Sequence, residues 1–270
     1  MWRSYDCALH NKIRRTYCFG IALPTSSPPT TSYNYCDVPS KKETILKVLA
    51  VIPAFNEEAC LKQTVSNLID TCPQIDFLVV NDGSKDRTED ICRDNGYPHL
   101  TMPVNCGLSC GFQAGMRYAK EHGYDAVVQF DADGQHLPEY IAPMADEISK
   151  GADIVIASRV LAGEGPVGAR GAGSKLISGL IRISSGIKIT DPTSGMRMFG
   201  KDLISTYADG FDLAPEPDAI ALFARKEKKI VEIPAQMQER QGGTSYLDLP
   251  NIIRYMSRTC ISIILFQWFR

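Results

Sequence analysis

The chain has 270 residues, 44% of them hydrophobic, and a formal net charge of −2, which predicts one large or two small domains with a substantial core. The near-neutral balance of charge argues against a nucleic-acid partner. Nine cysteines, an odd number scattered along the chain, argue against a disulfide framework and favour free thiols in a reducing cytosol.

The first 44 residues differ in composition from the rest. They contain the stretch LPTSSPPTTS at 23–32, in which proline, serine and threonine predominate. Such segments favour disorder or extended conformations over a packed core. We therefore expect residues 1–44 to form a poorly ordered N-terminal extension.

Apolar runs and amphipathic segments alternate from Lys47 onward. Continuous apolar runs, typical of buried strands, occur at 47–55, 77–82, 98–103, 125–130 and 153–158. Segments that read as helices follow at 56–72, 83–96, 107–123 and 138–151. This alternation predicts an α/β fold with a Rossmann-like, mostly parallel sheet flanked by helices.

Polar and charged residues follow the predicted strands, at the ends where ligands bind in such sheets. They are Pro53, Phe55, Asn56 and Glu57 after the first strand, Asn81 and Asp82 after the second, Asp131 and Asp133 after 125–130, and Ser158 and Arg159 after 153–158. Any one of the acids could cap a helix or form a turn, and Arg159 could form a surface ion pair with Asp153 or Glu164. Their shared placement favours a common binding site.

The stretch QFDADGQH at 129–136 places Asp131, Asp133 and Gln135 at alternate positions. In an extended segment alternate side chains point the same way, so three oxygen ligands would converge. This set suits a hard divalent cation, and the alternative is a polar loop, since Asp-Gly is a common turn. We expect His136 to be a solvent-facing loop residue, because imidazole suits softer metals than Mg²⁺.

These residues lie within a series of motifs that resembles the family-2 glycosyltransferases of the GT-A fold. Within that family the series is most similar to the dolichyl-phosphate mannosyltransferase-like branch, which makes polyprenyl-phosphate sugars. The matching stretches, in family order, are VIPAFNEE (51–58), VVNDGSKDRT (79–88), NCGLSCGFQAG (105–115), FDADGQH (130–136), ASR (157–159), DPTSGMRMF (191–199) and EIPAQMQERQGGTS (232–245). The resemblance implies a GT-A glycosyltransferase domain over residues 45–245.

The resemblance also implies roles for individual residues. The positions that line the nucleotide pocket are matched by Pro53, Phe55, Glu57 and Asp82, with Asp82 facing the base. The site of the donor diphosphate and of its metal, Mg²⁺ or Mn²⁺, is matched by Asp131, Asp133 and Gln135, and Arg240 matches a further contact to that diphosphate. The positions that hold the acceptor phosphate are matched by Arg159, Arg170 and Ser174. Asp131, Asp133, Arg159 and Arg240 are therefore the candidate catalytic residues.

The implied reaction is inverting transfer of a sugar from a nucleoside-diphosphate sugar to polyprenyl phosphate, for cell-envelope glycan synthesis. The motifs lean to UDP-linked N-acetylglucosamine or glucose as donor, with GDP-mannose as the other candidate. A phosphate monoester has a second pKa of about 6, so it is already nucleophilic near pH 7 and needs no general base. Two alternatives stay open: extension of a cell-surface polysaccharide at a hydroxyl group, and a nucleotide-sugar-binding module without turnover.

Three further residues are candidates for the site. Arg197 lies in the DPTSGMRMF motif, and Glu216 and Asp218 lie in the stretch PEPD at 215–218. Either acid could lie at the sugar, where a hydroxyl acceptor would need a base. The same stretch equally predicts the start of a helix with Pro217 in its first turn.

The C-terminal stretch NIIRYMSRTCISIILFQWFR (251–270) is mostly apolar, and we expect an amphipathic helix within 246–270. Its continuous apolar part is too short to span a bilayer of about 30 Å. The helix could pack on the sheet, lie in the membrane interface with Trp268 and Phe269 at headgroup depth, or dock on a small membrane protein. With a lipid acceptor, we expect a peripheral enzyme on the cytoplasmic face of the membrane.

Overall fold

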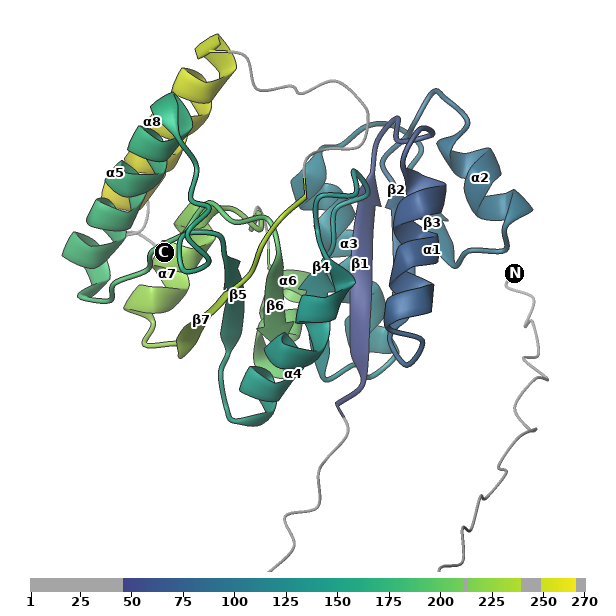
Figure 1. Cartoon of the computed structure of the whole chain (residues 1–270), viewed down its shortest axis with the longest axis horizontal. Helices are drawn as coiled ribbons and strands as arrows, with labels where there is room; N and C mark the ends of the chain where they lie inside the picture. Colours follow the sequence, from purple (N-terminus) through teal and green to yellow (C-terminus); the bar gives the residue numbers. More distant parts are fainter. Residues whose placement is uncertain (1–45, 211–212, 239–248, 266–270) are drawn as a thin grey trace, which may run out of the picture. The chain divides into compact units, whose positions relative to one another are not determined.

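A computed structural model describes residues 46–210, 213–238 and 249–265, so the expected N-terminal extension at 1–44 lies outside the described residues. Within this range the strands form a seven-stranded sheet in the order β3-β2-β1-β4-β6-β5-β7 (Figure 1). The strands are β1 (Val48–Ala54), β2 (Asp76–Asn81), β3 (His99–Thr101), β4 (Ala126–Gln129), β5 (Ile154–Ser158), β6 (Arg197–Gly200) and β7 (Ile230–Pro234). The helices are α1 (Leu61–Thr71), α2 (Thr88–Asp94), α3 (Leu108–Glu121), α4 (Ile141–Ser149), α5 (Gly168–Ser185), α6 (Lys201–Asp209), α7 (Pro217–Arg225) and α8 (Leu249–Ile264), with a 3₁₀ turn at Pro138–Tyr140.

The sheet is mostly parallel, as the alternation of strands and helices predicts. β1 pairs in parallel with β2 and β4, β2 with β3, and β5 with β7. β6 runs antiparallel between β4 and β5, and its residues, RMFG, are too few to show a strand period. Because β6 opposes both neighbours, β4 and β5 run in the same direction and end at the same edge of the sheet.

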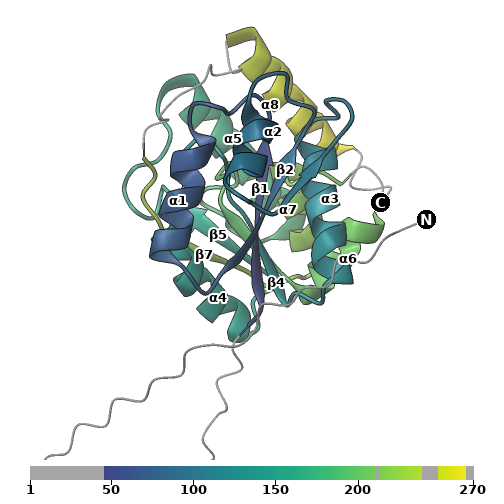
Figure 2. The same cartoon turned by 90° about the vertical axis from the view of Figure 1, so that its right-hand side faces the viewer.

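Both faces of the sheet are buried, which explains the continuous apolar runs of the sequence. On β1, Leu49 and Val51 join a core with residues of α3, whereas Ile52 joins a second core with residues of α1. Successive side chains of a strand point to opposite faces, so one strand serves both cores. Figure 2 shows α1 on one side of the sheet and α3 and α6 on the other.

The predicted C-terminal amphipathic helix is α8, which lies beside α5 (Figure 1) and contacts α5 and α7. Thr259 and Ile263, one turn apart, are buried, whereas Ile261 and Ile264 are exposed. One face of the helix therefore packs on the domain, and apolar side chains on another face are exposed to solvent. In the part of the chain that the structure describes, no helix is both long and apolar enough to cross a membrane.

Candidate active site at the carboxyl edge of the sheet

The loops that follow β1 and β2 hold each other in place. Asn56 adopts a left-handed backbone with φ of 56°, its amide oxygen accepts a 2.8 Å hydrogen bond from the Lys85 N–H, and its N–H donates to Ser84 Oγ at 3.0 Å. The N–H of Glu57 donates to Thr88 Oγ1 at 2.9 Å. Phe55 and Glu57, two of the predicted nucleotide-pocket residues, are partly exposed on this braced loop, and the third, Pro53, is partly exposed near the end of β1.

Asp82 fixes the start of α3. Its two carboxylate oxygens each accept a 2.8 Å hydrogen bond, one from the N–H of Cys106 and the other from the N–H of Gly107. The side chain is almost fully buried, so these charge-assisted bonds are strong. Gly83, with φ of +67°, lets the loop approach so closely that a Cβ there would lie 2.5 Å from the carbonyl carbon of Val104. Asp82 thus anchors the wall of the predicted nucleotide pocket, a role that the motif did not predict.

The Asp-x-Asp segment is a turn and not a continuation of the strand. β4 ends at Gln129, Ala132 and Asp133 lie in a turn, and Gly134 has φ of +77°. Oδ1 of Asp133 accepts a 3.1 Å hydrogen bond from the Gln135 N–H, as in an Asx turn. The expectation that an extended backbone aligns Asp131, Asp133 and Gln135 was therefore wrong, because the Asp-Gly pair bends the chain.

His136 is buried at 3% exposure, so the expectation of a solvent-facing residue was also wrong. Its Nδ1 accepts a 2.9 Å hydrogen bond from the Asp131 N–H, and its Nε2 lies 3.5 Å from Asp131 Oδ2. The ring packs edge-on against Phe130. The imidazole thus supplies the partner for a backbone group that the turn would otherwise leave unsatisfied.

The oxygen donors of this turn suit a hard divalent cation. Among the described residues no group of three or more His, Cys, Asp and Glu side chains is arranged to hold a metal. The oxygen-bearing side chains of the turn are the carboxylates of Asp131 and Asp133 and the amide of Gln135. Such a set leaves coordination positions for phosphate oxygens and water, which Mg²⁺ retains in nucleotide sites. The donor set fits Mg²⁺ or Mn²⁺ with a bound nucleotide.

A hydrogen-bonded cluster around Arg159 follows β5 at the same edge. The Arg159 guanidinium donates hydrogen bonds of 2.7 Å to each carboxylate oxygen of Asp191 and one of 3.1 Å to Thr193 Oγ1. Thr193 Oγ1 in turn donates to Ser174 Oγ on α5 at 3.1 Å. The structure therefore brings Arg159 and Ser174 together, and it adds Asp191 and Thr193, which the motif comparison had not assigned. Arg170 is exposed, one helical turn before Ser174.

The alternative of an ordinary surface pair for Arg159 was wrong. Asp153 instead pairs with Lys228 at 3.2 Å, and Glu164 accepts a 3.0 Å hydrogen bond from Gln236. Asp191 is fully buried, and its N–H donates to Glu232 at 2.8 Å. The partner of Arg159 is thus a fixed internal carboxylate.

The three remaining candidates are Arg197, Glu216 and Asp218, and the first and last of them form hydrogen bonds to other parts of the protein. Arg197 is buried and donates to the carbonyl oxygens of Pro192 at 2.7 Å and Pro215 at 2.8 Å, and burial lowers its pKa. Asp218 accepts a 2.7 Å hydrogen bond from Ser262 of α8. Glu216 caps α7, which begins at Pro217, so the helix-start interpretation of PEPD is confirmed. Arg240 lies outside the described residues.

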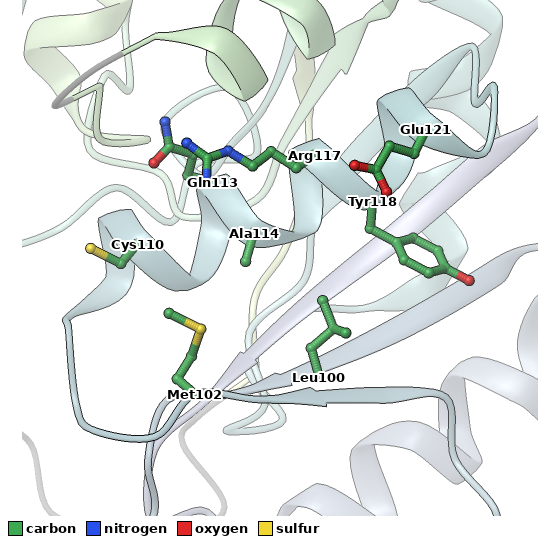
Figure 3. Close-up of a pocket in the computed structure, with 8 residues that line it drawn as sticks. All are labelled: Leu100, Met102, Cys110, Gln113, Ala114, Arg117, Tyr118 and Glu121. Carbon is green, nitrogen blue, oxygen red and sulfur yellow. The ribbon is translucent and has the colours of Figure 1, made fainter. Parts of the chain in front are cut away.

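A pocket of about 440 Å³ lies elsewhere, between β3 and α3. Figure 3 shows Leu100 and Met102 facing Ala114 of α3, with Arg117 and Glu121 further along the helix. No residue of the predicted site lines this pocket. The candidate site residues therefore lie outside this cavity, at the carboxyl edge of the sheet.

A Rossmann-like sheet with an Asp-x-Asp turn and a fixed arginine, Arg159, at its carboxyl edge is the arrangement expected of a nucleotide-sugar glycosyltransferase of the GT-A type. The family model described as Glycosyl transferase family 2 matches residues 49–207, and the chain belongs to this family. The predicted family is thus confirmed.

Two relatives extend the comparison. The undecaprenyl-phosphate mannosyltransferase of Micrococcus luteus is 36% identical over 217 residues, which cover 74% of this chain and 87% of that protein. The polyprenol monophosphomannose synthase of Mycolicibacterium smegmatis is 30% identical over 220 residues, which cover 76% and 83%. These similarities place the chain in the predicted polyprenyl-phosphate branch.

The fold is confirmed by a solved structure. Glucosyl-3-phosphoglycerate synthase from Mycobacterium tuberculosis, in complex with Mn²⁺, UDP-glucose and phosphoglyceric acid, matches with a TM-score of 0.62 at 18% identity, over 81% of this chain and 79% of that chain. At this identity the match concerns the GT-A fold alone.

Proposed function

We propose that the chain transfers a hexose or N-acetylhexosamine from a nucleoside-diphosphate sugar to polyprenyl phosphate, with inversion at the anomeric carbon. The observation that carries this proposal is that the Asp-x-Asp turn and the partly exposed guanidinium of Arg159 lie at the same edge of the sheet. The Asp-x-Asp turn follows β4, and Arg159 follows β5. A metal-binding turn suits the donor diphosphate and a presented guanidinium suits the acceptor phosphate, and both substrates are anions.

On the donor side, Asp131, Asp133 and Gln135 would hold Mg²⁺ or Mn²⁺ beside the diphosphate. When bound, the ion supplies Lewis-acid stabilisation of the charge that develops on the departing nucleotide. Pro53 at the end of β1 would line the nucleotide together with Phe55 and Glu57 on the braced loop that follows. Arg240 would add a second contact to the diphosphate. Asp82 would face the base, and its hydrogen bonds to the start of α3 hold that wall of the pocket rigid.

On the acceptor side, Arg159, Arg170 and Ser174 would hold the lipid phosphate. The Asp191 carboxylate fixes the orientation of the Arg159 side chain, so little rotamer entropy remains to be lost on binding. The phosphate oxygen is itself the nucleophile and requires no proton transfer near pH 7. In-line attack by this oxygen, opposite to the departing diphosphate, inverts the anomeric centre.

We further propose peripheral contact with the cytoplasmic face of a membrane through α5 and α8. These neighbouring helices expose Leu176 and Ile183 on α5 and Ile261 and Ile264 on α8. Exposed cations accompany them, among them Arg182 of α5 and Arg254 of α8. Apolar and basic side chains together favour an interfacial position on anionic lipid. Ser174 also lies on α5, so the contact would bring the membrane-embedded acceptor to the phosphate site.

The direct test is transfer of labelled sugar into lipid. The full chain is incubated with polyprenyl phosphate, Mg²⁺ or Mn²⁺, and radiolabelled UDP-N-acetylglucosamine, UDP-glucose or GDP-mannose, and the product is extracted into organic solvent. We expect metal-dependent label in the organic phase with one of these donors, and an anomeric configuration opposite to that of the donor. Polyprenol without its phosphate is the matched control and should accept no label.

The outcome of this assay distinguishes the proposed function from its alternatives. Label that stays in the aqueous phase with every donor would contradict the polyprenyl-phosphate acceptor. Aqueous labelled oligosaccharide would instead support the hydroxyl-acceptor alternative, and retention of anomeric configuration would contradict in-line attack.

A further inference from the structure

We propose that Gln129, His136 and Gly195 are positioning residues that fix the carboxylate of Asp131 in one orientation from three sides. This inference rests on the proposed metal role of Asp131 and adds residues that no motif assigned to it. It concerns how the protein prepares a ligand and not a direct contact with the substrate.

The first side is the imidazole of His136. Its Nδ1 accepts the hydrogen bond from the Asp131 N–H at 2.9 Å, so Nδ1 carries no proton and the proton of the neutral ring resides on Nε2. That Nε2–H lies 3.5 Å from Asp131 Oδ2. The ring is buried at 3% exposure and packs on Phe130. One imidazole therefore holds the backbone N–H of Asp131 and lies beside one of its carboxylate oxygens.

The second side is the amide of Gln129, the last residue of β4. The side chain is 3% exposed, and its Nε2 donates a 3.2 Å hydrogen bond to Asp131 Oδ1. Its Oε1 is buried and has no hydrogen-bond partner among the described residues. Exchanging the two amide atoms would place Oε1 against the carboxylate, so repulsion fixes the amide orientation. An unsatisfied buried acceptor is costly, and its presence here is explained if the donor end of the amide is required.

The third side is the backbone at Gly195. A Cβ at this position would lie 3.0 Å from Asp131 Oδ2 and 3.1 Å from His136 Nε2. A side chain there would require the carboxylate or the imidazole to shift by a few tenths of an ångström. The glycine therefore leaves room for both groups in their observed positions.

Together these contacts orient the carboxylate of Asp131 without pairing it with a lysine or arginine. Its two side-chain neighbours are the Gln129 amide and the His136 imidazole, and among the described residues no Lys or Arg forms an ion pair with Asp131. The side chain keeps 35% of its surface exposed for a ligand. Such outer contacts orient metal ligands, and their removal typically weakens metal affinity about 10- to 100-fold.

The test measures binding of Mn²⁺ to the full chain. The electron paramagnetic resonance signal of free Mn²⁺ reports the unbound fraction. One series contains excess UDP and a parallel series contains excess GDP. Gln129→Met removes the amide at similar volume, and His136→Phe removes both ring nitrogens but keeps a ring. We expect each to weaken Mn²⁺ binding about 10- to 100-fold. Gly195→Ala should weaken it as well, and His136→Asn, which restores an acceptor for the Asp131 N–H, should recover part of the loss.

Gln113→Met is the matched control, because this amide donates to the carbonyl oxygens of Tyr207 and Gly210 away from the turn.

Mn²⁺ affinities within twofold of the unmodified protein for Gln129→Met and His136→Phe would overturn the inference. If Gln129→Met fails to fold, His136→Phe and Gly195→Ala decide by the same criterion. Loss of binding in Asp133→Asn together with unchanged binding in the positioning variants would overturn this inference alone. No Mn²⁺ binding by the unmodified protein would overturn the metal role in the proposed function, and this inference with it.

Discussion

The guanidinium of Arg159 forms two parallel hydrogen bonds of 2.7 Å with the carboxylate of Asp191. Asp191 is fully buried, whereas the Arg159 side chain keeps 23% of its surface exposed. A bidentate pair has fixed geometry, so the exposed part of the guanidinium always faces the same way. We infer that Asp191 presents Arg159 to an incoming phosphate and is not itself a substrate contact.

Asp191→Asn should therefore impair use of the acceptor more than use of the donor. The amide keeps the shape of the side chain but loses the charge and one acceptor, so Arg159 becomes mobile. We expect KM for polyprenyl phosphate to rise about tenfold, equivalent to about 1.4 kcal/mol of binding, with KM for the nucleotide sugar within twofold. Steady-state kinetics with each substrate varied in turn would measure both.

The matched control for this prediction is Asp153→Asn, which removes the pair with Lys228 just before β5 begins. This variant should leave both KM values unchanged. An unaltered acceptor KM in Asp191→Asn would show that the orientation of Arg159 does not depend on its partner.

Much of the scaffold could be predicted because its signals are local. The parallel strands appear as continuous apolar runs, such as Val48–Ala54 and Ile154–Ser158, and in a parallel sheet their ends necessarily share an edge. Asp191 could not be assigned in this way. It lies 32 residues after Arg159, and the two meet because the short antiparallel β6 enters between β4 and β5.

The errors at the Asp-x-Asp segment have a different cause. Alternation along a strand is a valid argument only while the backbone stays extended, and Gly134 at φ of +77° ends that state. The burial of His136 depends on the Asp131 N–H, a backbone group whose need for a partner arises only once the turn has formed. Residue identity alone therefore predicts oxygen donors at this turn but not their geometry.

Asp133→Asn tests the metal role. Asn retains an oxygen that can accept the Gln135 N–H, so the turn should persist, whereas the charge that would bind Mg²⁺ or Mn²⁺ is lost. We expect sugar transfer to fall at least about 100-fold with an unchanged melting temperature. Transfer assays over a range of Mg²⁺ and Mn²⁺ concentrations, with thermal unfolding in parallel, would measure both quantities.

Asp146→Asn on α4 is the control for this change, because it removes the same charge from an exposed helix position. Full activity of Asp133→Asn would be incompatible with a metal ligand at this position.

The exposed apolar residues of α5 and α8 predict a defined membrane contact. Ile183 of α5 is 84% exposed and Ile261 of α8 is 49% exposed. The double variant Ile183→Gln, Ile261→Gln should reduce flotation of the protein with anionic liposomes at least about tenfold, because each apolar side chain contributes roughly 1.5–3 kcal/mol when it leaves water. Val104→Gln is the control, since Val104 is 62% exposed on the loop before α3. Equal flotation of the double variant and the unmodified protein would exclude these helices as the contact.

Gly115 lies where α3 packs closely on β1, so replacing it tests how tight that packing is. A Cβ at this helix position would lie 2.5 Å from Cγ1 and 2.7 Å from Cγ2 of Val51, a fully buried residue of β1. Val51 is β-branched and has little rotamer freedom with which to yield. Gly115→Ala gains about 1 kcal/mol of helix propensity, but overpacking costs about 1–3 kcal/mol. We expect net destabilisation, seen as a melting temperature lower by several degrees.

Gly179→Ala should shift the melting temperature in the direction opposite to that of Gly115→Ala. Gly179 lies in the middle of α5, and a Cβ there would meet no atom within 4 Å, so only the gain in helix propensity of about 1 kcal/mol remains. Its melting temperature should rise, while that of Gly115→Ala falls. Because both changes add one methyl group to a helix, the difference between them isolates the contact with Val51. A rise in both variants would mean that α3 can move away from β1 at little cost, and the close approach of helix and strand would then not be a constraint on the fold.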